Sequence, residues 1–280
     1  HADMLTVGQK ALFDKFSDSY SMPVYPTRRT GNAPDFVYEA TARNALSAHL
    51  ENDGESLVDA ITGIPFPIPQ SGKELIWNHK LRYRGTSLRR YNTQLAVQSN
   101  GAFQPYKLRE DVRFQYNQPN VTPASLNNVI IYFLQFTYAP ARQSGSVLLV
   151  HETMDQVAEA RRAWLYNPGQ RRIRRAPNVA YDNPGNGSDG LRTNDQLDQF
   201  NGATDRYTWK IVGKREMYMP YNAIKLADSA VCYKDMANRS HLEQRLTRYE
   251  RRRVWVLDSE LRQGASHMYK RRTYYIDEDT

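Results

Sequence analysis

The spacing of apolar residues along the chain changes character near Lys80. Before this residue apolar side chains recur at helical spacing, and after it runs rich in Tyr, Val, Ile, Thr and Phe alternate with turn residues. A helix turns one face inward every 3.6 residues, whereas a strand does so every second residue. The pattern therefore predicts a helical segment over residues 1–80 and an antiparallel β-sheet over residues 81–280, together forming one integrated domain.

Three helices are expected in the N-terminal segment. Thr6 and Gln9 have the spacing of a capping box, which satisfies the free N–H groups of a first helical turn. A second helix is expected to begin at Asp35, directly after a proline, and a third to occupy residues 71–79. Residues 63–69 carry proline at every second position, which excludes a central strand and favours an extended strap laid across another element.

The sheet region divides into runs separated by turn residues. Strands are expected near residues 81–98, 103–116, 129–138, 146–166, 171–176, 207–218, 245–258 and 265–277. A long loop is expected over residues 177–206, because this stretch is rich in Pro, Gly, Asn and Asp.

The expected strand 129–138 is apolar on both faces. Ile131 and Phe133 point to one side, and Tyr132 and Leu134 point to the other. A strand of this kind needs neighbours on both faces. We therefore expect a mainly β fold with flanking helices: one long, strongly curved antiparallel sheet, with the N-terminal helices packed in or over its hollow. Such a hollow leaves room for an apolar cavity.

Charge is unevenly distributed along the chain, whose net charge is +8. Residues 1–80 carry 7 Lys and Arg against 10 Asp and Glu, whereas the remainder carries 31 against 20. A basic surface suits an anionic membrane, a nucleic acid or an acidic partner. Arg interleaved with aromatic residues, as in 251–255 and 270–275, occurs in single-strand nucleic-acid binders and equally in the side-chain ladders of structural sheets. We favour the structural interpretation and expect no nucleic acid.

Motifs for enzyme chemistry are incomplete. Residues 185–190 match the dinucleotide pattern G-x-G-x-x-G, but that pattern needs a preceding strand and a following helix, and both flanks here are loop-like. His151-Glu152 begins like the zinc motif H-E-x-x-H, yet Asp155 occupies the second histidine position. No G-x-S-x-G elbow occurs, and the single cysteine, Cys232, cannot form an internal disulfide. We therefore expect no enzyme activity, no metal site and no cofactor.

The chain also contains four pairs of short motifs in a fixed order. They are GIPFPIP (63–69) with IWNH (76–79), RAWLY (162–166) with PGQRR (168–172), DRYTWKIVGKREMY (205–218) with PYN (220–222), and RVWV (253–256) with YYIDED (274–279). Together these motifs extend over nearly the whole chain, and they resemble the bacterial family known as domain of unknown function 1329 (DUF1329).

The resemblance implies a fold similar to the periplasmic lipoprotein carriers of the LolA/LolB type, in which helices close a half-open antiparallel barrel over an apolar hollow. It implies a protein exported to the periplasm of a Gram-negative bacterium and longer than this chain at both ends. The chain begins His1-Ala2-Asp3, so the export signal is expected to lie outside it. The resemblance also implies that the protein works beside an RND-type exporter and an outer-membrane partner. It identifies no catalytic or ligand-binding residues.

From these observations we expect a periplasmic, non-enzymatic carrier or binding protein for a lipid or another hydrophobic molecule. The candidate contacts are large aromatic residues on expected strands: Tyr132, Phe136, Trp164, Tyr207, Trp209 and Trp255. Burial of apolar surface would drive binding, at roughly 25 cal/mol per Å². Two alternatives stay open: a scaffold subunit that docks through its basic face to a membrane surface or an envelope complex, and, more weakly, a nucleic-acid-binding protein.

Overall fold

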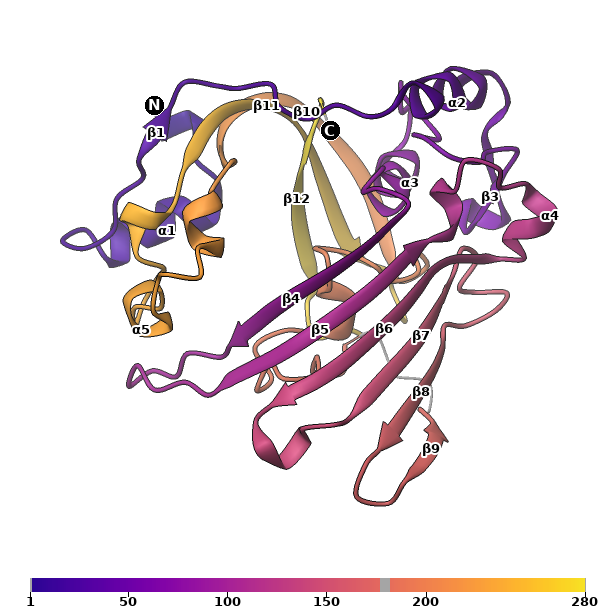
Figure 1. Cartoon of the computed structure of the whole chain (residues 1–280). Coiled ribbons are helices and arrows are strands. Elements are labelled where there is room, and N and C mark those ends of the chain that lie inside the picture. Colours follow the sequence, from indigo (N-terminus) through magenta and orange to yellow (C-terminus); the bar gives the residue numbers. More distant parts are fainter. Residues whose placement is uncertain (1, 177–181, 280) are drawn as a thin grey trace.

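The strands form two separate main sheets. The computed structural model describes residues 2–176 and 182–279, and within these ranges it contains a six-stranded sheet, a four-stranded sheet and a two-stranded hairpin (Figure 1). The predicted fold class, mainly β with helices and antiparallel sheets, is confirmed in this coarse form. The prediction of one continuous sheet is wrong, because no pairing among the described residues joins the two main sheets.

The six-stranded sheet is an antiparallel meander in which each strand pairs with the next along the chain. Its strands are β4 (Ser87–Leu95), β5 (Pro105–Phe114), β6 (Val129–Ala139), β7 (Val147–Thr153), β8 (Arg162–Asn167) and β9 (Arg172–Arg175). The predicted strand 146–166 is two strands, β7 and β8. Asp155 breaks it, because its Oδ1 accepts hydrogen bonds from the backbone N–H groups of Val157 (3.0 Å) and Ala158 (2.8 Å) and so stabilises a turn.

The four-stranded sheet is built around two long strands. Its members are β1 (Val24–Tyr25), β10 (Tyr207–Pro220), β11 (Tyr249–Leu261) and β12 (Arg271–Asp277). β10 pairs with β11 in antiparallel fashion along its whole length, from Tyr207 opposite Leu261 to Pro220 opposite Tyr249. β1 and β12 share the other edge of β11, and β1 is parallel to it.

The helices follow the sequence expectation closely. They are α1 (Val7–Lys15), α2 (Asp35–Ser47), α3 (Gly72–Leu81), α4 (Pro123–Leu126) and α5 (Tyr233–Met236). The predicted capping box is present, since Gln9 N donates to Thr6 Oγ1 (3.1 Å) and Thr6 N donates to Gln9 Oε1 (2.8 Å). A hairpin of β2 (His49–Glu51) and β3 (Ser56–Val58), which the sequence analysis did not predict, follows α2.

The proline-rich strap connects α2 to α3. Asn44 of α2 donates a 2.7 Å hydrogen bond to the carbonyl of Thr62, just before the strap. Asn78 of α3 holds Phe66 on both sides, because its Oδ1 accepts from Phe66 N (2.9 Å) and its Nδ2 donates to Phe66 O (2.6 Å). Proline-rich backbone lacks N–H donors, so side-chain amides supply the hydrogen bonds that fasten it to the two helices.

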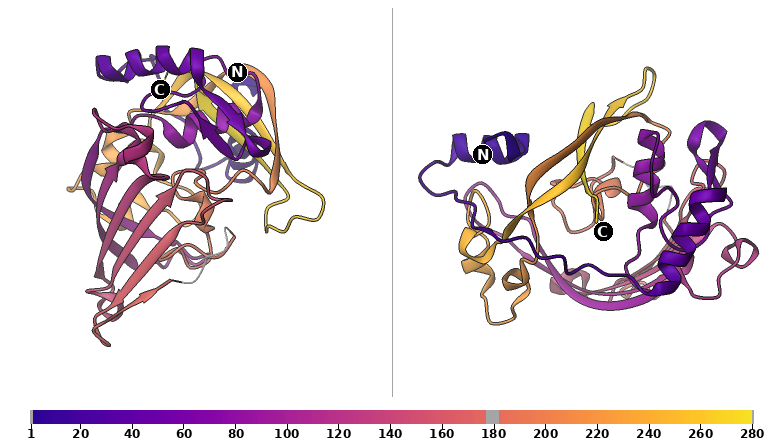
Figure 2. Two further views of the ribbon diagram at one scale, coloured as in Figure 1. Left: turned by 90° about the vertical axis from the view of Figure 1, so that its right-hand side faces the viewer. Right: turned by 90° about the horizontal axis from the view of Figure 1, so that it is seen from above.

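Helix α3 packs against both main sheets. Leu75 and Ile76 lie in a core cluster with Leu257 of β11, and Trp77 lies in a second cluster with Ile130 of β6. Seen from above, α3 and strands β10–β12 lie on the same side of the six-stranded sheet (Figure 2). Helix α3 therefore lies between the two main sheets and borders the space that separates them.

Candidate functional site

A cavity of about 260 Å³ lies between the six-stranded sheet, α3 and the loop of residues 182–206. Its floor is a row of five apolar side chains that are consecutive partners across β4–β8, here named the apolar rung: Leu88, Val112, Phe133, Val150 and Ala163. Same-face neighbours on adjacent strands touch one another, so the rung forms a continuous apolar band. We call this side of the sheet its inner face.

Polar groups lie beside the apolar rung, on the side nearest α3. Glu152 of β7 is 7% exposed, and Arg161 binds it through two contacts, Nε to Oε2 (2.8 Å) and Nη2 to Oε1 (2.9 Å). Gln156 donates a further hydrogen bond to the same carboxylate.

Lys80, the penultimate residue of α3, lines the cavity here and is 8% exposed. Burial lowers the pKa of Lys80 to about 8, although the nearby Glu152 carboxylate opposes the shift.

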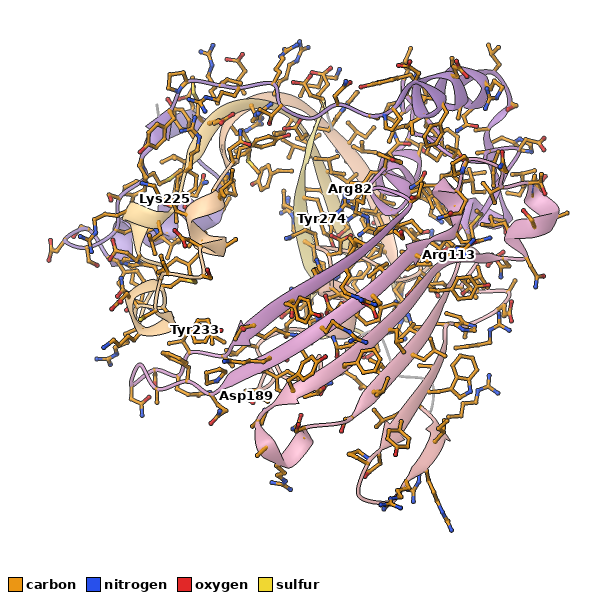
Figure 3. All side chains as sticks on the ribbon, in the orientation of Figure 1. Arg82, Arg113, Asp189, Lys225, Tyr233 and Tyr274 are labelled. Carbon is orange, nitrogen blue, oxygen red and sulfur yellow. The ribbon has the colours of Figure 1, made fainter. Side chains whose placement is uncertain are left out.

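On the opposite side of the rung lies a carboxylate whose two oxygens both accept hydrogen bonds. Glu110 of β5 is 1% exposed and accepts hydrogen bonds from Arg90, from Asn92 (2.8 Å) and from Gln135 (2.9 Å). Beyond it, the loop residue Asp189 lies beside the start of β5 (Figure 3), where Gln98 donates a 3.3 Å hydrogen bond to it. The cavity is thus apolar in the middle and polar at both ends.

The loop that covers the cavity is fastened by ion pairs, which are buried around Asp195 and partly exposed around Asp198. Asp195 is 2% exposed and lies 2.9 Å from Arg272 Nη1 of β12 and 3.2 Å from His267 Nε2. Asp198 binds Arg82 (2.7 Å) and Arg84 at the end of α3. The prediction of a long loop is confirmed for residues 182–206, while residues 177–181 lie outside the described part of the chain.

The loop also contributes to the boundary of the cavity and to the core behind it. Leu197, Phe200 and Asn201 line the cavity wall. The Phe200 ring contacts Trp209 (5.1 Å between ring centroids) and Tyr274 (6.0 Å). Tyr274 of β12, labelled in Figure 3, packs against the core cluster that contains Leu75 and Ile76 of α3. The loop therefore belongs to the folded core and closes the cavity on the side away from the six-stranded sheet.

The wall of the cavity is positively charged. It carries two carboxylates, those of Glu152 and Asp198. Against these stand five basic side chains: Lys80, Arg84, Arg90, Arg161 and Arg192. Burial lowers the pKa of Arg84 to about 10, opposed by the Asp198 carboxylate. Opposite charges in a low-dielectric site attract strongly, so the cavity favours an anion over a cation.

A second, more open groove of about 770 Å³ lies between α2, the strap and β10. Its charged side chains pair with one another: Arg262 Nη1 lies 2.8 Å from Asp53 Oδ2, and Lys73 also contacts Asp53 (3.4 Å). In the cavity, by contrast, Lys80 has no ion-pair partner among the described residues, so the cavity is the stronger candidate for a binding site.

Three of the six predicted contact residues lie on the outer face of the six-stranded sheet. Tyr132 and Trp164 stack edge-on against His151, each at 4.8 Å between ring centroids. Phe136 lies beneath the Arg109 guanidinium at 3.9 Å. Their inner-face neighbours on the same strands line the cavity instead. The prediction that these three side chains line the hollow is therefore corrected, because strand alternation turns them away from it.

The other three predicted residues belong to the four-stranded sheet. Tyr207 is 1% exposed and donates a 2.7 Å hydrogen bond to Tyr269 O. Trp209 borders the second groove, and Trp255 lies beneath Lys214 Nζ at 4.2 Å. None of the three lines the enclosed cavity, and their role as ligand contacts stays a prediction.

The sequence analysis missed the cavity residues for a physical reason. The alternation of side chains places Ile131 and Phe133 on one face of β6. Because the other face is apolar as well, alternation alone does not predict which face points into the cavity. Lys80 gave no signal, because a lysine in the last turn of a helix is ordinarily a solvated group that favours the helix dipole.

No helix within the described ranges combines the length and the hydropathy needed to cross a bilayer. Among the same residues, no group of three or more His, Cys, Asp or Glu side chains is placed to hold a metal ion.

The fold and the cavity together define a mainly β protein with a partly open, amphipathic site between its sheet and loop. The family model described as "Protein of unknown function (DUF1329)" matches residues 1–280. The chain belongs to this family. An uncharacterized protein of Pseudomonas aeruginosa is 49% identical to it over 280 residues, which are 100% of this chain and 62% of the relative. The chain thus spans less than two thirds of that relative's length.

Solved structures overlap the chain in part. A DUF1329 family protein from Desulfovibrio piger is 13% identical and covers 70% of this chain and 63% of its own, with a TM-score of 0.43. A LolA superfamily protein from Nitrosomonas europaea is 10% identical and covers 75% of this chain and 67% of its own, with a TM-score of 0.38. With TM-scores of 0.43 and 0.38, the two folds superpose on this chain only in part.

Proposed function

We propose that this protein binds a hydrophobic molecule in the cavity over the apolar rung and carries it without chemical change. The observation that supports this most directly is the apolar rung, which gives an internal space of about 260 Å³ a continuous apolar floor. That volume is close to the lower end of small-molecule sites, roughly 300–1,000 Å³. Removing an apolar ligand from water there would contribute roughly 25 cal/mol per Å² of buried surface.

The proposed setting is the Gram-negative periplasm, where the carrier would work beside an RND-type exporter and an outer-membrane protein. This part rests on the family resemblance. In this proposal the two main sheets act as the two walls of a half-open barrel, and the loop of residues 182–206 acts as its cover. Fractionation of cells that produce the full-length protein is expected to place it in the periplasm. Recovery in the cytoplasm would contradict the proposal.

The scaffold alternative predicts a hollow filled by side chains. A scaffold gains stability from dense packing and has no use for internal space, since interiors are ordinarily close-packed. The unfilled space of about 260 Å³ over the rung therefore favours a carrier.

The binding test uses the neutral fluorescent dye Nile red on protein purified without detergent. Val150→Trp places a large side chain on the rung and is expected to weaken dye binding at least tenfold. Leu149→Trp, one residue earlier on the outer face, is the matched control and is expected to leave binding within twofold. Equal effects of the two substitutions would contradict binding in this cavity.

Native mass spectrometry of the same preparation gives a second readout. A hydrophobic molecule that copurifies with the wild-type chain is expected to be absent from Val150→Trp. A bare protein mass, together with no uptake of Nile red, would contradict the carrier function.

A further inference from the structure

Lys80 is a buried cation for which the described residues supply no hydrogen-bond acceptor. Its side chain is 8% exposed and lines the cavity. Its ammonium lies 4.1 Å from the centroid of the Trp77 ring, and among the described residues it makes no hydrogen bond and no ion pair. A buried charge is costly unless it is paired and hydrogen-bonded, so this position needs an explanation.

Nearby carboxylates do not supply the missing partner, because other groups already bind them. Glu152 is bound by Arg161 and Gln156. Glu55 binds Lys73 Nζ at 2.9 Å and also accepts a hydrogen bond from the backbone N–H of Thr204 (3.0 Å). Both carboxylates act on Lys80 through space, as do the more distant Asp155 and the Arg161 guanidinium.

Arg84 adds a second unmet donor on the same part of the wall. Its Nε is buried and has no hydrogen-bond partner among the described residues, although its terminal nitrogen binds Asp198. Its guanidinium lies 4.6 Å from the centroid of the Phe114 ring. Lys80 and Arg84 also line the same small cavity of about 10 Å³ next to the main one. Two cationic donors thus border the α3 end of an apolar floor.

We propose that the cavity takes an amphiphile with an aliphatic chain and an anionic head group, whose chain lies on the apolar rung and whose head accepts a hydrogen bond from Lys80. The head is a carboxylate, as in a fatty acid, or a phosphate monoester, as in a simple acidic lipid. This inference rests on the proposed carrier function and specifies its ligand. The excess of basic over acidic side chains in the wall favours the same charge.

The protonation of Lys80 gives the inference a pH signature. Burial lowers its pKa to about 8, and the facing groups Glu152, Glu55 and Asp155 oppose the shift while Arg161 adds to it. The ammonium is therefore mostly charged at pH 7 and mostly neutral at pH 9.5. Over this interval an anionic ligand loses its charged partner, the Lys80 ammonium, and is expected to bind more weakly. A neutral ligand of the same length has no such partner, so its affinity is expected to stay level.

The test measures displacement of Nile red by three ten-carbon ligands: decanoate, decyl phosphate and 1-decanol. In the wild-type chain both anions are expected to bind more tightly than decanol at pH 7. Lys80→Met keeps the length and the apolar stem of the side chain, and it is expected to weaken anion binding about ten- to a hundredfold, in line with the loss of a hydrogen bond to a charged group. It is expected to leave decanol within twofold. Lys10→Met, at an exposed lysine of α1, is the matched control.

The outcomes separate the inference from the function on which it rests. If wild type binds decanol but shows no preference for either anion, or if Lys80→Met weakens all three ligands equally, the head-group site is wrong and the carrier function stands. If wild type takes up no Nile red, the carrier function fails and the head-group site with it; if the dye binds but none of the three ligands displaces it, the head-group site alone is wrong. A preference for decyl phosphate or for decanoate identifies which head group the site takes. As a second readout, wild-type affinity for decanoate is expected to fall between pH 7 and 9.5, and that of Lys80→Met is expected to stay level.

Discussion

The Lys80 ammonium lies 4.1 Å from the centroid of the Trp77 ring, three residues earlier on the same helix. A cation above an aromatic face is attracted to it, and this contact offsets part of the cost of burying the charge. Trp77 is itself fully buried, and its Nε1 donates a 2.9 Å hydrogen bond to Gly54 O. The indole is therefore held in place, and it positions the ammonium at the cavity wall.

The first prediction is that Lys80→Met stabilises the unliganded protein at pH 7. The pKa of Lys80 falls from 10.5 to about 8 on folding, chiefly through burial, which corresponds to about 3 kcal/mol as an upper value. Because the unfolded chain binds the extra proton between pH 8 and 10.5, wild-type stability is expected to rise with pH across that window and to approach that of the variant. Chemical unfolding measured from pH 6 to 10.5 checks this. A variant less stable than wild type at pH 7 would contradict it.

Trp164→Ala is expected to leave ligand binding within twofold and to lower the free energy of unfolding by about 2 kcal/mol. The ring lies on the outer face of β8 and packs on His151, so its removal costs contacts without changing the cavity. The neighbouring substitution Ala163→Phe, on the inner face, is the counterpart and is expected to abolish Nile red binding. Weaker dye binding by Trp164→Ala would instead support the original assignment of this tryptophan as a ligand contact.

Gly72→Ala is expected to destabilise the protein by about 1–3 kcal/mol through overpacking. Gly72 begins α3, and a Cβ there would lie 2.5 Å from the carbonyl carbon of Trp209 and 2.6 Å from its oxygen. The absence of a side chain lets the helix touch the backbone of β10. Gly8→Ala in α1 is the control, since nothing lies within 4 Å of its Cβ position, and it is expected to stabilise by up to about 1 kcal/mol. Equal effects in urea unfolding would contradict the close approach.

Glu250→Gln is expected to reduce stability at pH 7 by about 3 kcal/mol, because it removes the carboxylate that lies 2.8 Å from the buried Arg252 and leaves this guanidinium only the more exposed Asp279, at 3.8 Å. Burial by itself raises the pKa of Glu250, but hydrogen bonds from Arg28 N, Asn222, Arg248 and Arg252 outweigh this and lower it to about 2. The folded-state pKa lies below the unfolded value of 4.5, so the contribution is present above pH 4.5 and is lost as pH falls toward 2.

Acid unfolding of the two proteins checks that statement. The stability difference between wild type and Glu250→Gln is expected to shrink steadily below pH 4.5. Glu39→Gln, at an exposed position of α2, is expected to change stability by less than about 0.5 kcal/mol. A difference that stays constant down to pH 2 would show that Glu250 acts by shape and not by charge.

Local structure was the part of the fold that the sequence predicted well. The capping box of Thr6 and Gln9, the helix start at Asp35 and the strap of residues 63–69 are each encoded within a few residues, and each is present. The meander of β4–β9 was also predictable, because its strands pair with their sequence neighbours. The split between β7 and β8 was missed because one carboxylate, that of Asp155, makes the turn.

By itself the sequence determined the mainly β class, the helical N-terminal segment, the long loop and the DUF1329 family. The tertiary structure decided which side of each strand faces the cavity. Both faces of β6 are apolar, so hydrophobic periodicity cannot distinguish the inner face from the outer one. It also decided the environment of Lys80. Whether an ammonium is solvated or buried depends on α3 packing beneath the loop and against β6, contacts between residues distant in the chain. Burial and the absence of a partner, which make Lys80 a candidate head-group site, are properties of that packing alone.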